Sequence, residues 1–177
     1  MKKDIIAILS VVLIIVVLAC GVEIQSVDEY YLTHIDNIKP DSKTVFLSIR
    51  CDSVFENYDK LDSSLKNSAY IPENGIILEK AEYVLRENDT VYDILDRILR
   101  YNKIMYERRG SSDSSVYIVG INYLYEYSCG PLSGWMYSVN GVFSDKSCTE
   151  YVLSDGDVIE WVYSCDLGRD VGKKGGQ

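Results

Sequence analysis

Cysteine is the residue type in this chain that is best suited to covalent chemistry. After Cys20, the 177-residue sequence holds four more, at positions 51, 129, 148 and 165. If the chain is exported, an even number of cysteines predicts disulfide bonds, with three alternative connectivities. A four-cysteine zinc site is the alternative, but such sites commonly use a C-x-x-C pair, and this sequence has none. We therefore expect disulfides rather than a metal.

The other reactive side chains do not form a set that is typical of catalysis. His34 is the single histidine and lies in a stretch without periodicity, so neither a Ser-His-Asp nor a Cys-His arrangement is expected. Asp155 and Asp157 lack the spacing of an EF-hand and suit a turn. Asp157 with Glu160 is left as an alternative acid–base pair. We predict no catalytic residues and no enzymatic activity.

The N-terminus has the features of an export signal. Two lysines precede an apolar run over residues 5–19, which is shorter than the roughly 20 residues that a membrane span needs. The run ends in Val17-Leu18-Ala19-Cys20-Gly21, which resembles the bacterial lipobox and predicts lipidation of Cys20. The alternative for residues 1–20 is an uncleaved membrane anchor. Both hypotheses put the remaining chain at the extracellular face of the cell membrane, with residues 21–43 as a tether.

The charge of the chain argues against a nucleic-acid partner. Its formal net charge is −9, and without residues 1–20 it has 16 basic and 26 acidic side chains, a charge of −10. Such a surface repels phosphate backbones, because like charges face each other at short range. An acidic balance also keeps many exported proteins soluble. We expect membrane attachment through the N-terminus and no binding of nucleic acid.

Alternating apolar residues predict several short strands. Thr44–Arg50 and Val158–Tyr163 are the first and the last, and both are rich in β-branched and aromatic residues. Trp135 to Val139 is followed by Asn140-Gly141, a strong hairpin signal, and we expect the return strand at Tyr151–Leu153. Further strands are expected over residues 76–78, 81–85 and 116–121, with an alternating stretch over 123–129, a long loop over 52–75 and a break over 108–115.

One long helix is expected between these strands. The apolar side chains at positions 91, 94, 95, 98 and 99 form a single stripe at helical spacing, and Thr90 with Asp93 can form a capping box. A lone helix covers only one face of a sheet. The order of elements therefore predicts an α+β fold of the β-grasp type, a mixed sheet packed on one helix.

In a β-grasp arrangement the first and last strands lie side by side and parallel. Cys51 ends the first strand and Cys165 ends the last, so we expect these two to come level and to form one disulfide. Cys129 and Cys148 flank the hairpin and are expected to form the other. These two bridges would staple the small core, because closing loops lowers the entropy of the unfolded chain.

Several segments point to a known family. They are residues 88–95 (NDTVYDIL), 121–122 with Leu124, 129–141 (CGPLSGWMYSVNG), 155–161 (DGDVIEW) and 165–168 (CDLG). On these residues, positions 44–167 resemble the transcobalamin-like C-terminal domain, a family also described as a domain of unknown function in bacterial surface proteins. The Gly-rich residues 168–177 are expected to be a disordered tail.

The resemblance also implies a binding site. In the vitamin B12 carriers of this family, the domain closes over a corrinoid that is held against a separate helical barrel. By resemblance, Trp135, Met136 and Tyr137 lie on the strand that touches the corrinoid. Met136 stands where the family has a glutamine, and this chain contains neither the helical barrel nor an axial histidine. Cobalamin binding is implied only with a partner that supplies the rest of the pocket.

These observations predict a non-catalytic, membrane-tethered extracellular binding module. Its ligand-binding residues are expected to be Trp135, Met136 and Tyr137, since aromatic rings give contact area with little loss of entropy. The partner is expected to be a surface protein or a small ligand. For the tryptophans, the alternative is that Trp135 and Trp161 only fill the core. For the protein, the alternative function is the binding of a corrinoid together with a partner.

Overall fold

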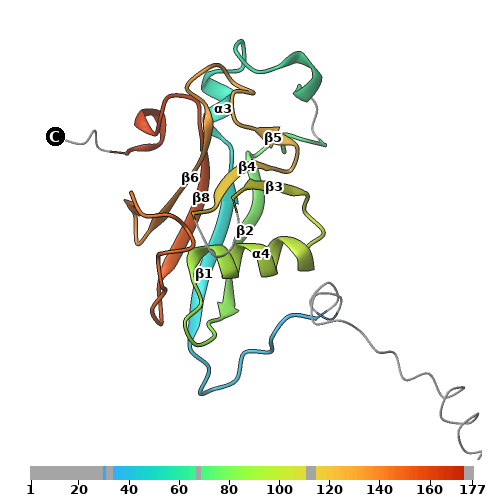
Figure 1. Ribbon diagram of the computed structural model, residues 1–177. Helices are drawn as coiled ribbons and strands as arrows, with labels where there is room; N and C mark the ends of the chain where they lie inside the picture. The colour runs from blue at the N-terminus through green and yellow to red at the C-terminus, as the bar shows by residue number, and fades with distance from the viewer. Residues whose placement is uncertain (1–29, 31–33, 67–68, 111–114, 174–177) are drawn as a thin grey trace, which may run out of the picture.

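The computed structural model describes residue 30 and residues 34–66, 69–110 and 115–173 (Figure 1). The expected signal or anchor over residues 1–20, including Cys20, lies outside these residues. The strands are β1 Thr44–Arg50, β2 Ile76–Val84, β3 Tyr106–Arg109, β4 Tyr117–Ile121, β5 Leu124–Tyr125, β6 Gly134–Val139, β7 Val142–Phe143 and β8 Val158–Ser164. The helices are α3 Ser53–Glu56 and α4 Val91–Tyr101, with 3-10 turns η1 Ser63–Leu65 and η2 Arg169–Val171.

The main sheet has five strands in the order β2-β1-β8-β6-β7. β1 pairs with β8 in parallel, with Phe46 opposite Val158 and Arg50 opposite Val162, while the other neighbours are antiparallel. The prediction that the first and last strands lie side by side is confirmed. The described chain is thus a mixed α+β fold that is dominated by sheet, has one main helix and forms no closed barrel.

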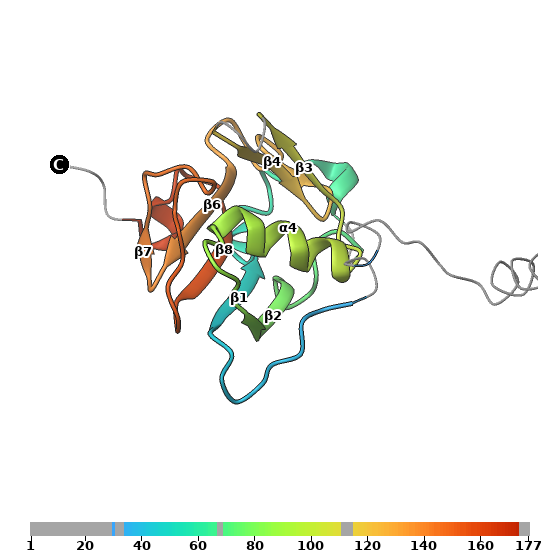
Figure 2. The same ribbon diagram turned by 60° about the horizontal axis from the view of Figure 1, so that its bottom comes forward.

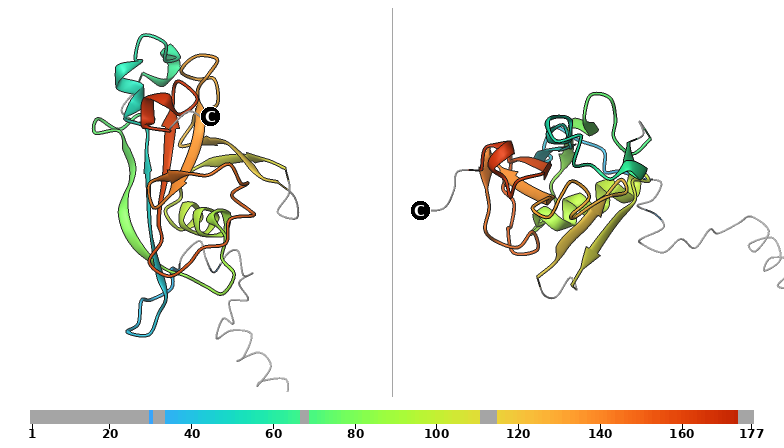
Figure 3. Two further views of the ribbon diagram at one scale, coloured as in Figure 1. Left: turned by 90° about the vertical axis from the view of Figure 1, so that its left-hand side faces the viewer. Right: turned by 90° about the horizontal axis from the view of Figure 1, so that it is seen from above.

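A second sheet, of order β3-β4-β5, lies on the same side of the main sheet as α4. Figure 2 shows α4 in front of β8 and β1, and Figure 3 shows α4 and the second sheet on the same side of the main sheet. β3 was not expected from the sequence, because its residues Tyr106–Arg109 are mostly charged and exposed. Within the part that the structure describes, no helix has the length and apolar character that a membrane crossing needs.

The core lies between the main sheet and α4. Val45, Leu47 and Ile49 alternate along β1 and are fully buried, which is the period of two that the sequence predicts. All five apolar stripe residues of α4 are buried as well. The capping box is present: the Thr90 side chain accepts from the Asp93 amide, and the Asp93 side chain accepts from the Thr90 amide.

The hairpin that follows β6 differs from the prediction. Asn140 and Gly141 adopt positive φ values of 53° and 78°, as a tight two-residue turn requires, and the return strand is β7 at Val142–Phe143. The expected return strand at 151–153 is wrong, since Val152 forms only an isolated bridge with Thr90. A two-residue turn reverses the chain at once, so the strand that follows it directly becomes the partner.

The expected disulfides are not found. Cys51, Cys129, Cys148 and Cys165 are buried and carry free thiols. The register explains the first pair: Arg50 lies opposite Val162, so Cys51 comes level with Tyr163 and is about 7 Å short of Cys165 along the strand. The second pair is not bonded either: the Cys129 thiol contacts the Asn57 carbonyl at 3.5 Å, whereas the Cys148 thiol contacts the Val116 carbonyl at 3.5 Å.

Residues 168–173, which we assigned to the tail, are part of the described structure. Gly168 adopts a left-handed φ of 93° at the start of η2, and a side chain there would collide with Lys173. The Asp170 carboxylate accepts hydrogen bonds from the Cys165 amide at 2.7 Å and from the Ser164 hydroxyl at 2.5 Å. These bonds hold η2 against the end of β8.

Candidate functional site

The three residues expected to bind ligand lie on opposite faces of β6. Trp135 and Tyr137 face the core and are 5% and 7% exposed, whereas Met136 faces outward and is partly exposed. Trp135 Nε1 donates to the Leu124 carbonyl at 2.7 Å, and the Tyr137 hydroxyl donates to the Lys146 carbonyl at 2.7 Å. The two aromatic side chains therefore contribute to the core, and they do not form an open aromatic face.

Aromatic rings pack across β6 and β8 on the inner face. Trp135 lies against Tyr163 with ring centroids 5.4 Å apart at 70°, and Tyr137 lies against Trp161 at 5.4 Å. These pairs follow from the register, which sets Trp135 opposite Tyr163 and Tyr137 opposite Trp161. The cluster fixes the position of β6, and so it fixes the walls of the clefts beside it.

A first cleft, here called the inner cleft, has a volume of about 270 Å³. It lies between β6 and the start of β4 and is bordered by the loop after β7. All three residues predicted to bind ligand line it. Its lining consists of residues 115–118, 135–137, 144–148 and Trp161.

A second cleft, here called the outer cleft, has a volume of about 530 Å³ and lies beside the first residues of the same strand. Tyr127 and Leu167 are its most exposed large side chains, at 65% and 57%. Its full lining is Tyr117, Tyr127, Pro131, Leu132, Ser133, Gly134, Trp135, Met136, Ser164, Leu167 and Lys173. Exposed aromatic and aliphatic groups that converge on one hollow are typical of a binding surface.

Tyr117 connects the two clefts. It lines both of them together with Trp135 and Met136, and it is 42% exposed. Its hydroxyl lies 3.3 Å from the position that a Cβ of residue 134 would take, so glycine leaves room for the ring. Burial, and then a hydrogen bond with Glu126, raise the pKa of Tyr117 to about 12, so the phenol is neutral at physiological pH.

Few charges face the clefts. Among the described residues, Lys173 is the single charged one that lines the outer cleft, and its ammonium lies 3.4 Å from the Asp145 carboxylate. In the inner cleft, Asp145 and Lys146 have opposite charges. The electrostatics of both clefts therefore favour a ligand with little net charge.

The exposed residues of the outer cleft are not predicted by the sequence. Tyr127, Leu132 and Leu167 lie in turns, where apolar residues have no period that marks them as inward or outward. The available signal was the Gly130-Pro131 turn inside an apolar, tyrosine-rich stretch. Tyr127 and Leu167 adopt positive φ values of 68° and 50°, which are uncommon for such residues.

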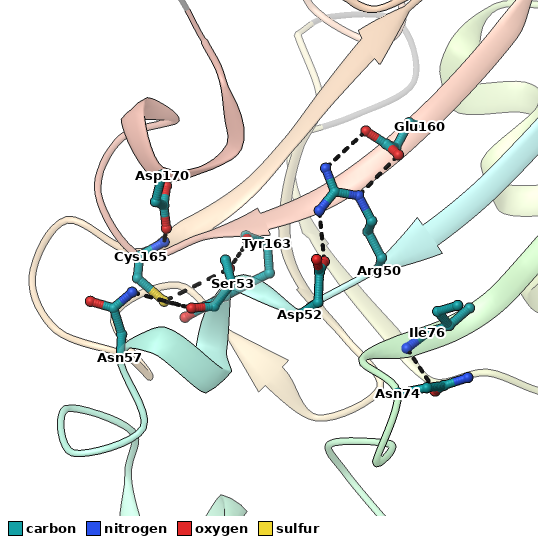
Figure 4. Close-up of polar contacts among 10 residues, drawn as sticks. All are labelled: Arg50, Asp52, Ser53, Asn57, Asn74, Ile76, Glu160, Tyr163, Cys165 and Asp170. Carbon is teal, nitrogen blue, oxygen red and sulfur yellow. Dashed lines mark hydrogen bonds and ion pairs between the residues drawn. The ribbon is translucent and has the colours of Figure 1, made fainter.

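A polar network at the C-terminal end of β1 is the other notable cluster (Figure 4). Arg50 donates from Nε to Glu160 Oε1 at 2.9 Å and from Nη1 to Asp52 Oδ1 at 2.6 Å. Nearby, the Ser53 hydroxyl donates to the Tyr163 carbonyl. These groups satisfy one another, and across the described residues no cluster of three His, Cys, Asp or Glu side chains could hold a metal ion. We assign this network to the stability of the fold.

Comparison with known protein families gives a match to a domain whose function is not known. Residues 88–164 match the family described as "Domain of unknown function (DUF4430)". This segment runs from the N-terminal side of α4 to the end of β8 and contains most of the residues that line the two clefts. No curated protein matches the chain.

Among solved structures, the chain is similar to haptocorrin in complex with Cbi. The sequence identity is 14% and the TM-score is 0.47. The similarity covers 75% of this chain and 27% of the haptocorrin chain, so the chain spans about a quarter of the length of that structure.

Proposed function

We propose that this protein is a non-catalytic binding module that holds a ligand of low net charge in the two clefts beside β6. The observation that carries the proposal is the convergence of Tyr117, Tyr127, Leu132 and Leu167 on the outer cleft. Exposed apolar side chains gathered around a hollow cost solubility unless a ligand or partner covers them. The ring pairs Trp135–Tyr163 and Tyr137–Trp161 hold β6 in place beside the clefts. A wall that is already ordered lowers the entropy cost of binding.

A dye titration tests whether the outer cleft binds apolar ligands. The probe is bis-ANS, added to the full chain and followed by its fluorescence. Tyr127→Ser and Leu167→Ser should each weaken binding about tenfold, which corresponds to about 1.4 kcal/mol. The matched control is Tyr101→Ser, because Tyr101 is also exposed but lines neither cleft. Equal binding by all four proteins would contradict the proposal.

A corrinoid is the second candidate ligand. In this alternative, the protein binds the corrinoid together with a partner protein that supplies the other half of the pocket. Its support is that Trp135, Met136 and Tyr137, the residues that the family resemblance implies, all line the inner cleft. Met136 is the member of this set that is partly exposed. An absorbance titration with cobalamin tests the isolated domain, and an unchanged spectrum would reject binding without a partner.

We also propose that the module is held at the extracellular face of the cell membrane through its N-terminus. The support is the apolar run over residues 5–19 and the lipobox-like sequence at Cys20. Metabolic labelling with a fatty acid should give a labelled protein, and Cys20→Ala should lose the label. An unmodified protein that takes up no label would exclude lipidation of Cys20 and leave the uncleaved anchor as the means of attachment.

A further inference from the structure

β6 has one free edge. On one side it pairs with β8 along all six residues, from Gly134 opposite Ser164 to Val139 opposite Ile159. On the other side β7 pairs only with Ser138 and Val139. In the described part of the chain, no strand pairs with residues 134–137 on that side. Natural proteins usually cover or shorten such an edge, because it can accept a strand from another chain.

The backbone groups at this edge belong to Trp135 and Tyr137. The Asn140 amide donates to the Val158 carbonyl at 2.8 Å, which marks the even-numbered residues of β6 as those that bond to β8. By alternation, the amides and carbonyls of the odd-numbered residues Trp135 and Tyr137 point to the opposite edge. They lie two residues apart, about 6.8 Å, which is the spacing at which an extended backbone presents its own bonding groups.

The two clefts meet at this edge, where Tyr117, Trp135 and Met136 line both of them. Tyr137 and Trp161, on the inner face, line only the inner cleft, whereas Gly134 and Ser164, on the other face, line only the outer cleft. A strand added beside β6 would point successive side chains to opposite faces. Its side chains would therefore enter the inner and outer clefts in turn, which is how strand addition gains specificity.

Trp161 adds a chemical preference to the inner cleft. This side chain lines the cleft, is 3% exposed, and its Nε1 is the buried side-chain donor for which the described residues offer no partner. Buried donors are usually satisfied, and an unsatisfied one is costly. An oxygen acceptor that enters the inner cleft could satisfy this donor.

We propose that the partner is an extended peptide segment of another protein, which pairs as an added strand with Gly134–Tyr137. The segment carries an apolar side chain toward the outer cleft and, at a neighbouring position, a side chain with an oxygen acceptor toward the inner cleft. This inference rests on the proposed function, since the same clefts hold the ligand. It goes further because the backbone of the ligand, and not only its apolar groups, is recognised.

The first test uses an eight-residue peptide chosen by phage display on the full chain and then synthesised. Each backbone amide of this peptide is methylated in turn, which removes one donor at a time. Pairing with β6 predicts a loss of about tenfold or more at every second amide and little change between them. A loss that follows a helical period, no loss at any amide, or no selected peptide would overturn the inference. Retained bis-ANS binding in those cases would leave the proposed function standing.

The second test follows the amides of β6 by hydrogen exchange and NMR. In the free protein, the amides of Met136 and Ser138 should be protected because they bond to β8, while those of Trp135 and Tyr137 should exchange faster. The selected peptide should slow exchange at Trp135 and Tyr137 and leave Met136 and Ser138 unchanged. Unchanged exchange at Trp135 and Tyr137 with bound peptide would exclude strand pairing.

The third test concerns the acceptor. Trp161→Phe removes the indole N–H and should weaken a peptide with Thr at the inner position about tenfold. A peptide with Val at that position has the same shape without the acceptor, so it should bind both proteins equally. Equal weakening of both peptides would show that the ring and not the donor matters, and it would overturn the proposed preference for an oxygen acceptor.

Discussion

Two buried tryptophans with nearly equal exposure differ in one hydrogen bond. Trp135 donates from Nε1 to the carbonyl of the fully buried Leu124 at 2.7 Å, while Trp161 Nε1 has no partner among the described residues. Their rings make comparable contacts, each with a tyrosine at a centroid distance of 5.4 Å. The difference between them is therefore mostly the difference between a satisfied and an unsatisfied donor.

This difference predicts unequal effects of the same substitution. Trp135→Phe leaves the Leu124 carbonyl without its partner, whereas Trp161→Phe removes a donor that was already unsatisfied. We expect Trp135→Phe to lower the free energy of unfolding by about 1–3 kcal/mol more than Trp161→Phe. Urea unfolding followed by far-UV circular dichroism measures both values. Equal losses, or a larger loss for Trp161→Phe, would mean that the indole bond is not what separates them.

At the scale of elements, α4 is held at its N-terminal end by polar contacts. Arg97 donates to both carboxylate oxygens of Asp89 at 3.2 and 2.6 Å, and both side chains are nearly buried. Arg97 also donates to the Val84 carbonyl at the end of β2 at 3.1 Å. Together with the capping box at Thr90, these bonds join the end of β2, the loop before the helix and the middle of α4.

The cap gives a prediction for this element. Thr90→Ala removes the acceptor for the Asp93 amide and should lower the free energy of unfolding by about 0.5–2 kcal/mol. Thr90→Ser keeps the hydroxyl and serves as the matched control, with an expected loss well below that of Thr90→Ala. The measurement is thermal or urea unfolding of the three proteins. If Thr90→Ser is as unstable as Thr90→Ala, the methyl group and not the cap accounts for the loss.

The sequence predicts those elements whose side chains meet a clear inside and outside. β1, β8 and α4 each have a buried face, so their apolar residues recur at the strand or helix period, and their predicted bounds agree closely with the structure. β3 and α3 are short, and β3 is largely exposed, so no period marks them. The return strand expected at 151–153 is wrong because the turn geometry selects Val142–Phe143, a strand of two residues that is too short to show an alternating pattern.

The site residues that lie on a strand could be predicted from the sequence, and those that lie in loops could not. The sequence pointed to β6 and to Trp135, Met136 and Tyr137, which do line a cleft. It did not point to Tyr127 or Leu167, since loop side chains are placed by tertiary contacts rather than by a repeat. The thiol pairing failed because it needed the register of β1 on β8, and a shift of two residues moves a side chain by about 7 Å.

At the scale of the whole molecule, many titratable groups are buried in neutral form. Burial raises the pKa of the Cys51 thiol to about 12 and that of the Cys148 thiol to about 11. Burial also raises the pKa values of the Cys129 and Cys165 thiols and of the Tyr106 and Tyr163 phenols. All of these groups are uncharged when protonated, so the folded state opposes their ionisation.

This burial predicts that the fold is sensitive to alkali. The folded state keeps its thiol protons at pH values where an unfolded thiol, with a pKa of 9.0, loses them. The folded state then binds more protons than the unfolded state, so the free energy of unfolding falls as the pH rises. The contribution of the buried thiols to the free energy of unfolding should be fully present below about pH 9. Above that pH it should fall by at most about 1.4 kcal/mol per pH unit for each thiol.

Urea unfolding at pH 7, 9 and 10, at constant ionic strength and with a reductant to keep the thiols reduced, measures this dependence. Cys51→Ala removes one buried thiol, so its free energy of unfolding should fall less steeply above pH 9 than that of the unmodified protein. Its value at pH 7 can be lower, because the substitution leaves a small cavity, but the slope does not depend on that loss. A stability that stays level to pH 10, or an identical slope for both proteins, would mean that the thiols ionise as easily in the folded chain as in the unfolded one. The thiols would then have to be accessible to water, which the fully buried position of Cys51 at the end of β1 opposes.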